Sequence, residues 1–241
     1  AGRLPQVDKS QLLREMGRHV PLRKQCSARQ SVDQHLAALT NGHNRRTLNL
    51  NYAIEIDDRQ KVVSRLREVL LDPKTSVEVL QLGNNSIERQ IVLLADALSR
   101  NKSLTRLYLN TNNIGVCGCF LPMAAALYKN QSMTLLDLGR NSIPAQGGIA
   151  LAGALRENSS LSRLMLRGNE IGCRGCAALA NTLHTNSSLT ELDLSDNGIG
   201  STGGTAIGQA MHVNTSLKSL GLGGNDIGPE AGLKIAEALR V

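Results

Sequence analysis

A pattern of about 28 residues recurs six times along the chain, and it constrains the fold more than any other feature of the sequence. Its most regular copy reads Leu-Thr-Glu-Leu-Asp-Leu-Ser-Asp-Asn-Gly-Ile-Gly over residues 189–200. The central leucine of the six copies stands at Leu80, Leu107, Leu136, Leu164, Leu192 and Leu220, so that successive copies lie 27 to 29 residues apart. Such a period predicts a solenoid, in which each unit packs only on its neighbours.

Each repeat predicts one β-strand followed by one helix. In the copy quoted above, Leu192 and Leu194 alternate with polar residues, so we expect the leucines to face a buried core and the polar residues to face solvent. After a turn, the apolar residues of 172–183 recur every three or four positions, which is helical spacing. Stacked repeats of this kind place their strands side by side in one parallel sheet.

Two columns of asparagine accompany the repeats. The first column follows the strands and consists of Asn85, Asn112, Asn141, Asn169, Asn197 and Asn225. A side-chain amide both donates and accepts, so a stacked column can satisfy backbone groups that each turn leaves unpaired, and we interpret it as a structural ladder. The second column ends the helices at Asn101, Asn130, Asn158, Asn186 and Asn214. There we expect the asparagine to adopt a left-handed helix end and not to carry a glycan.

The repeats divide the chain into two parts. Residues 1–44 are expected to form a basic helical cap, because solenoids need their first repeat covered. Residues 45–241 hold a degenerate first repeat over 45–76, where Ala53 replaces the ladder asparagine, and then about six repeats over 77–241. The last repeat has no equivalent cap, so we expect either that the chain is a fragment of a longer protein or that a partner or a second copy of the chain covers its apolar edge.

Cysteine usage and hydropathy bear on the compartment of the protein. No apolar run approaches the length that spans a bilayer, and no secretory signal is recognised near the first residue, so no membrane association is expected. An odd cysteine count without such a signal predicts reduced thiols in an intracellular protein. We therefore expect the cytoplasm, with nucleus, cilium and organelle left open. The cysteines are Cys26, Cys117, Cys119, Cys173 and Cys176.

The sequence does not predict an enzyme. The two closely spaced cysteine pairs lie two repeats apart, which is too far for one four-cysteine zinc site. The glycines recur at repeat positions and do not gather in one phosphate-binding loop. We therefore expect no metal, no cofactor and no catalytic residue.

The repeat unit resembles a known family. Residues 171–183 read Ile-Gly-x-x-Gly-x-x-Ala-Leu-Ala-x-x-Leu, which is similar to the ribonuclease-inhibitor-like subfamily of leucine-rich repeats. Similar repeats occur in ribonuclease inhibitor, Ran GTPase-activating protein, tropomodulin, NOD-like receptors and ciliary proteins. The resemblance covers residues 77–241 and implies an α/β horseshoe with a concave parallel β-sheet and convex α-helices. It specifies the fold and none of those functions.

The variable positions of the predicted strands point to a binding surface. Arginine, tyrosine and methionine are enriched at protein interfaces, and the middle repeats carry all three. Leu135 and Met165, expected to be exposed beside Tyr108, favour a binding face over an ordinary solvated one. The predicted partner-binding residues are Arg106, Tyr108, Leu135, Asp137, Arg140, Arg163, Met165, Arg167, Glu191, Asp193 and Asp196. We thus predict a non-enzymatic scaffold that binds another protein through its concave sheet.

Two alternatives remain open. Residues 1–46 contain nine lysines and arginines against three acidic residues, which allows attachment to RNA or a ribonucleoprotein. Against this, the segment has no aromatic residue on which a base can stack. The second alternative is a regulator of a small GTPase, which only the resemblance to Ran GTPase-activating protein suggests.

Overall fold

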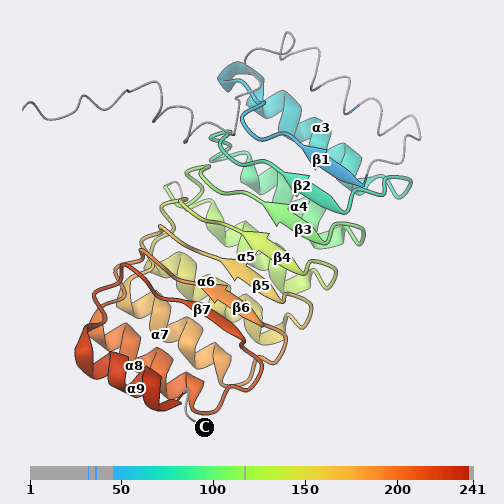
Figure 1. The fold of residues 1–241 in the computed structure, drawn as a ribbon. Helices are drawn as coiled ribbons and strands as arrows, with labels where there is room; N and C mark the ends of the chain where they lie inside the picture. Colours follow the sequence, from blue (N-terminus) through green and yellow to red (C-terminus); the bar gives the residue numbers. More distant parts are fainter. Residues whose placement is uncertain (1–31, 33–35, 37–45, 117, 239–241) are drawn as a thin grey trace, which may run out of the picture.

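The computed structural model describes residues 32, 36, 46–116 and 118–238, and within them seven β-strands alternate with seven α-helices (Figure 1). The strands are β1 (Thr47–Asn49), β2 (Val79–Gln81), β3 (Arg106–Tyr108), β4 (Leu135–Asp137), β5 (Arg163–Met165), β6 (Glu191–Asp193) and β7 (Ser219–Gly221). The helices are α3 (Arg59–Leu71), α4 (Ile91–Arg100), α5 (Phe120–Lys129), α6 (Ala145–Glu157), α7 (Gly172–Leu183), α8 (Gly200–Met211) and α9 (Gly228–Ala238). A short 3-10 turn, η2 (Ile56–Asp58), precedes α3.

The strands form a single parallel sheet in sequence order from β1 to β7. The central leucines of neighbouring repeats pair directly, so that Leu107 lies opposite Leu136 and Leu136 lies opposite Leu164. This register is the one that the repeat spacing predicts. The α/β solenoid with one parallel sheet is therefore confirmed.

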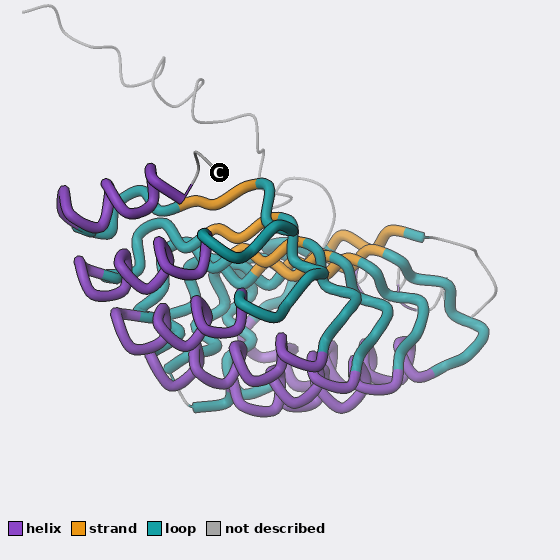
Figure 2. Tube along the Cα trace, turned by 90° about the horizontal axis from the view of Figure 1, so that it is seen from below, coloured by secondary structure: helices purple, strands orange, loops and turns teal. Residues whose placement is uncertain are grey.

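The sheet lines the inner side of a curved molecule, and the helices line its outer side (Figure 2). Paired strands lie about 4.8 Å apart, whereas packed helices need about 8–10 Å. The helical side of each repeat is therefore wider than the strand side, and stacking the repeats curves the sheet inward. This curvature gives the strand residues that point away from the helices a common concave surface.

The core fills the space between sheet and helices. Leu107, Leu136 and Leu164 are completely buried there. Close helix contacts depend on small residues: a Cβ on Gly175 of α7 would lie 2.6 Å from Cγ2 of Ile171 and 3.1 Å from the carbonyl oxygen of Ala145. Glycine at this position lets α7 approach the first turn of α6.

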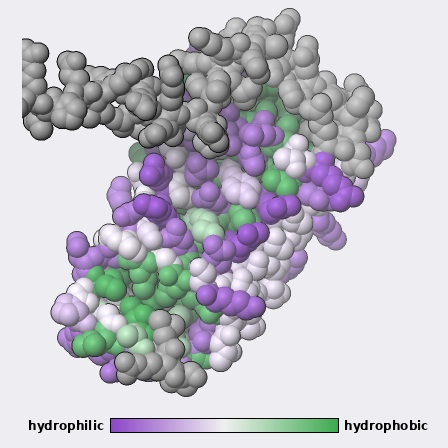
Figure 3. Space-filling model, viewed as in Figure 1, coloured by the Kyte–Doolittle hydropathy of each residue, from purple (hydrophilic) through white to green (hydrophobic). Residues whose placement is uncertain are grey.

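The two ends of the repeat array differ. Val32 and Leu36 are helical and buried in the hydrophobic core, but the rest of the predicted cap lies outside the described residues. At the other end, Leu217, Leu220 and Leu222 are only partly buried, whereas the corresponding leucines of the preceding repeat are fully buried. Figure 3 shows hydrophobic surface gathered at this C-terminal end. None of the helices in the described ranges is long and apolar enough to cross a membrane.

Candidate partner-binding face

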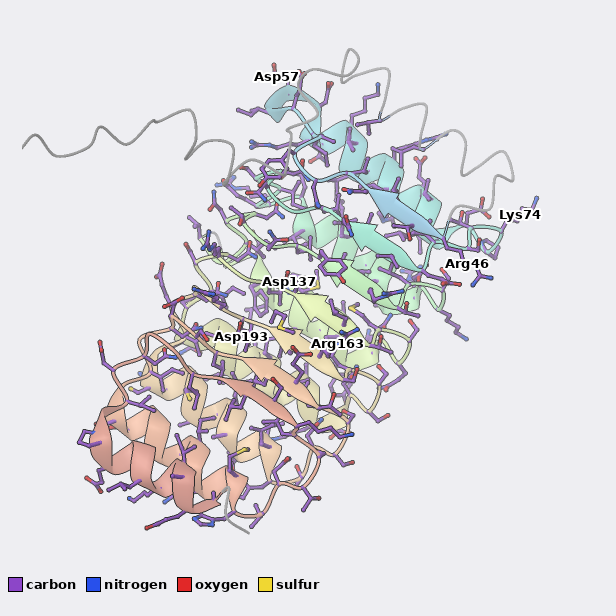
Figure 4. The ribbon with its side chains drawn as sticks, in the orientation of Figure 1. Arg46, Asp57, Lys74, Asp137, Arg163 and Asp193 are labelled. Atoms are coloured by element: carbon purple, nitrogen blue, oxygen red, sulfur yellow. The ribbon has the colours of Figure 1, made fainter. Side chains whose placement is uncertain are left out.

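The concave surface is built from the residues on either side of each central leucine. Pairing of β3 to β6 arranges them in two rows, because residues at equivalent strand positions lie opposite one another. Row one consists of Arg106, Leu135, Arg163 and Glu191. Row two consists of Tyr108, Asp137, Met165 and Asp193. Figure 4 shows Asp137, Arg163 and Asp193 together on this surface.

Leu135 is not exposed, and the sequence-based expectation for it was wrong. Only 5% of its surface is accessible, although it belongs to the concave row. The register places Leu135 between Arg106 and Arg163, both of which are exposed. The long aliphatic stem of an arginine can cover an apolar neighbour while its charged head stays in water. Tyr108 and Met165 remain partly exposed in row two.

A pocket of about 380 Å³ lies where row two meets the loops that follow the strands. It brings together five of the eleven predicted binding residues, namely Asp137, Arg140, Met165, Arg167 and Asp193. The six that do not line it are Arg106, Tyr108, Leu135, Arg163, Glu191 and Asp196. The predicted set therefore separates into a pocket at one edge and a flatter surface beside it.

Sequence reasoning missed five residues of this pocket, which are Tyr52, Asn84, Asn110, Thr111 and Gly139. Three of them share a position with Arg140, directly before the ladder residue of their repeat. Tyr52, Asn84, Thr111 and Arg140 all have positive φ angles, between 55° and 60°. This backbone conformation is uncommon for residues other than glycine. The column before the ladder residue was the signal that could have extended the predicted site into the first repeats.

The pocket holds two carboxylates that make no ion pair within the described part of the chain. Oδ1 of Asp137 accepts a hydrogen bond from the backbone N–H of Gly139 at 2.9 Å. Burial raises the pKa of Asp137, the hydrogen bond from Gly139 opposes this, and the charge of Asp193 adds to the rise. Asp193 accepts a hydrogen bond from the backbone N–H of Ser195 at 2.9 Å.

The arginine at the rim of the pocket forms an ion pair, whereas the two aspartates form none within the described residues. Nε of Arg167 donates to Asp196 at 2.9 Å, and both side chains remain about half exposed. An exposed pair of this kind contributes little to stability, about 0–1 kcal/mol. The pair therefore leaves both charges accessible to a partner.

The ladder asparagines are buried behind the face and bond between repeats. In Asn141, Oδ1 accepts from the backbone N–H groups of Asn112 at 2.8 Å and Ile114 at 3.4 Å. Its Nδ2 donates to the carbonyls of Leu109 at 2.9 Å and Leu138 at 3.0 Å. Asn85, Asn112, Asn169, Asn197 and Asn225 likewise donate to backbone carbonyls of their own and the preceding repeat. Their side-chain amides are therefore already used in hydrogen bonds that join neighbouring repeats.

The second asparagine column has a different structure from the one expected. Asn130 ends α5 with φ −79° and ψ 123°, which is extended and not left-handed. Its Nδ2 donates to the carbonyl of Leu98 in the preceding repeat at 2.7 Å, while Oδ1 accepts from Met133 N–H at 2.8 Å. Asn101, Asn158, Asn186 and Asn214 make the corresponding bonds. These side-chain amides form a second ladder of hydrogen bonds between repeats, in which each Nδ2 atom is a donor.

The cysteines do not form a metal centre in the described residues, where no group of three or more potential ligands is placed to hold a metal. Cys173 is an exposed free thiol, and Cys176 is a buried one. Burial, with a smaller contribution from Cys173, raises the pKa of Cys176 to about 12, so this thiol stays protonated at neutral pH. Cys119 is disulfide-bonded, which differs from the expectation of reduced thiols throughout.

Comparison with known proteins agrees with this geometry. A family model described as Leucine Rich repeat matches residues 129–152, 157–180, 185–208 and 213–236. Residues 129–236 therefore contain four leucine-rich repeats. Each unit is a short strand and an α-helix over about 28 residues, as the repeat spacing predicts. A search of curated protein sequences found no match.

Two solved structures resemble the leucine-rich repeat chain. The C-terminal domain of tropomodulin from Caenorhabditis elegans has a TM-score of 0.54 and 17% sequence identity, and the match covers 61% of this chain and 89% of that one. The structure titled leiomodin-1 actin-binding site 2 has a TM-score of 0.44 and 18% identity, over 86% of this chain and 87% of that one. At 17% identity the likeness to the tropomodulin domain concerns the fold alone.

Proposed function

We propose that this leucine-rich repeat protein is a non-enzymatic scaffold that binds another protein through the concave sheet of its middle repeats. The observation that carries the proposal is the arrangement of row two, where Tyr108 and Met165 are partly exposed beside a pocket of about 380 Å³. Tyrosine and methionine at the centre of a surface favour protein contacts, and strands hold them rigidly.

The charges of the face support a partner with a complementary pattern. Row one exposes Arg106 and Arg163, whereas row two contains Asp137 and Asp193. Neither aspartate forms an ion pair within the described ranges, and a half-buried carboxylate without one is costly to keep. A partner that places acidic groups over row one and a basic group over row two would compensate these charges.

Binding suits the pocket better than nucleophilic catalysis. Among the described residues, its lining includes no histidine, cysteine or serine. The buried ladder asparagines behind it are already hydrogen-bonded to the backbone. The remaining carboxylates and guanidinium groups are suited to recognising charge on another molecule.

The test is to capture a partner with the full chain and then measure its affinity for variants. Tyr108→Ala and Arg163→Ala should each weaken binding by about 1 kcal/mol or more, which is roughly a fivefold rise in Kd. Thr47→Ala changes an exposed residue at the equivalent position of β1, two strands away from β3, and serves as the control. Unchanged affinity in both test variants would rule out the concave face as the binding surface.

The two alternative functions have no support from the described residues. RNA attachment depends on residues 1–46, of which only 32, 36 and 46 are described. It remains a prediction, and titrating RNA binding against salt tests it, because charge-driven binding weakens steeply as salt rises. No observation favours a role in regulating a GTPase.

A further inference from the structure

The convex side of the solenoid carries an apolar groove between α5 and α6, on the opposite side from the proposed partner-binding face. Helix α5 has no charged residue before Lys129. Its solvent-facing positions include Leu121, Ala125 and Tyr128, whose spacing of four and three residues aligns them in one stripe. Leu121 is 59% exposed and Tyr128 is 50% exposed.

Helix α6 provides the other wall of this groove. Its Ala150 and Ala154 line a space of about 300 Å³ together with Ala124 and Ala125 of α5, and Leu121, Tyr128 and Lys129 complete the lining. Ile149, at the outer surface of α6, is 38% exposed. Small side chains form much of the lining and large apolar ones stand at its border, so another element can approach closely and cover apolar surface.

Other helices expose single apolar side chains, such as Val92 of α4 and Leu233 of α9, whereas α5 and α6 together expose Leu121, Tyr128 and Ile149. The neighbouring α3 and α4 carry the ion pairs Arg65–Glu68, Arg67–Asp96 and Arg100–Asp96 on their outer sides. Helix α7, on the other side, exposes Arg174 and Asn181. A local apolar patch within an otherwise polar helical surface is the mark of an interaction site.

One end of the groove is positively charged. Lys129 lines the groove at the C-terminal end of α5, and Arg156 lies in the last turn of α6. Both side chains are exposed, and neither forms an ion pair with another described residue. Glu157 follows Arg156 at the end of α6 and is also exposed, but of these three charged residues only Lys129 lines the groove.

We propose that this groove binds an amphipathic α-helix of a partner protein, with apolar residues in the groove and an acidic residue against Lys129. The distance from Leu121 to Lys129 along α5 is eight residues, or about 12 Å, which matches about two turns of a bound helix. An antiparallel orientation brings the partially positive N-terminus of that helix to the C-terminal ends of α5 and α6, where an acidic first turn is favoured. The site is independent of the concave face.

A selection with displayed helices tests the proposal on the full chain. A phage library of amphipathic helices with a randomised face is selected on the wild-type protein and counter-selected on the double variant Leu121→Glu/Tyr128→Glu. We expect enriched sequences with apolar residues at three- and four-residue spacing and Asp or Glu in the first turn. Each single variant should raise the Kd of the enriched peptides about tenfold or more. Lys129→Glu should reverse the preference for an acidic first turn.

The control variant replaces an apolar residue that is about as exposed as Leu121 and Tyr128 but lies outside the groove. Val213→Glu changes a 55% exposed valine beyond the end of α8, outside the groove, and should leave the Kd unchanged. All changed positions are exposed, and a thermal melt of each variant checks that its fold is intact. Equal binding to wild type and double variant, or enrichment of basic first turns, overturns the proposal. A concentration-dependent dimer that Leu121→Glu abolishes also overturns it, because the occupant is then a second copy of the chain.

Discussion

A ladder asparagine bonds two repeats with one buried side chain. Replacing Asn141 with leucine would leave the backbone N–H groups of Asn112 and Ile114 without the side-chain oxygen that accepts from them. Asn141→Leu should therefore lower the free energy of unfolding by about 1–3 kcal/mol, which urea denaturation measures. Asn181→Leu, at an exposed position of α7, is the control and should change it much less. Equal midpoints for the two variants would contradict the structural role.

Asp137 is expected to destabilise the fold at neutral pH, because burial raises the pKa of its carboxyl group above the unfolded value. Its favourable contribution is complete below the unfolded pKa and is lost as the pH rises through the higher folded pKa. Asp137→Asn should thus be more stable than wild type at neutral pH, and this advantage should disappear below about pH 4. Asparagine retains an oxygen that can accept from Gly139.

Urea denaturation at neutral and acidic pH tests the sign of this effect. A variant that is less stable than wild type at neutral pH would show that the carboxylate is compensated within the fold. If the partner places a basic group over row two, Asp137→Asn should also weaken partner binding. A gain in stability together with a loss of affinity is the pattern expected of a residue kept for binding.

At the scale of secondary-structure elements, substitutions at two glycines distinguish the effect of side-chain packing in the folded state from the effect of backbone freedom in the unfolded chain. A Cβ on Gly175 of α7 would lie 3.1 Å from the carbonyl oxygen of Ala145 in α6, whereas a Cβ on Gly153 of α6 would meet nothing within 4 Å. We expect Gly175→Ala to lower the free energy of unfolding by about 1–3 kcal/mol through overpacking. Gly153→Ala should raise it by about 0.4–1 kcal/mol, because alanine restricts the unfolded chain. Thermal denaturation of both variants measures the difference, and the same sign in both would contradict the packing of α6 on α7.

The elements also show what the sequence could predict. Repeat spacing determined the register, because the central leucines must all face one core, and the two concave rows follow from that register. The burial of Leu135 could not be predicted, since alternation tells which side of a sheet a residue faces but not what the arginines on adjacent strands cover. The extended backbone at Asn130 was missed for a related reason: its amide bonds to the preceding repeat, and this contact determines its conformation.

The lining of the pocket also could not be predicted without knowing the backbone conformation. Tyr52 lies in the degenerate first repeat, where Ala53 replaces the ladder asparagine and hides the alignment. Its φ of 56° brings its side chain into the same column as Arg140. The apolar groove on α5 and α6 was missed because leucine and tyrosine at helical spacing are usually read as core. Only the packing of neighbouring helices shows which of the two apolar sides of α5 is buried.

At the scale of the whole molecule, stability should decline toward the C-terminal end. Among the described residues, opening an inner repeat breaks two interfaces, whereas opening the repeat of β7 and α9 breaks one, because α9 packs on α8 and β7 pairs with β6. We therefore expect amide hydrogen exchange, followed by mass spectrometry, to be faster in 219–238 than in 135–157. Equally slow exchange in both segments would mean that the last repeat does not open separately.

Equivalent leucines in the two repeats provide a second measure of the same gradient. Leu138 is fully buried after β4, and Leu222 holds the same repeat position after β7 but is only partly buried. Leu138→Ala should lower the free energy of unfolding by about 2–5 kcal/mol, since it leaves a cavity between two repeats. Leu222→Ala should cost clearly less, because solvent already reaches this side chain and, among the described residues, a repeat packs against it on one side only. If a partner covers the C-terminal edge, its addition should slow exchange in 219–238 and raise the cost of Leu222→Ala toward that of Leu138→Ala, whereas a partner bound only on the concave face should leave this difference in place.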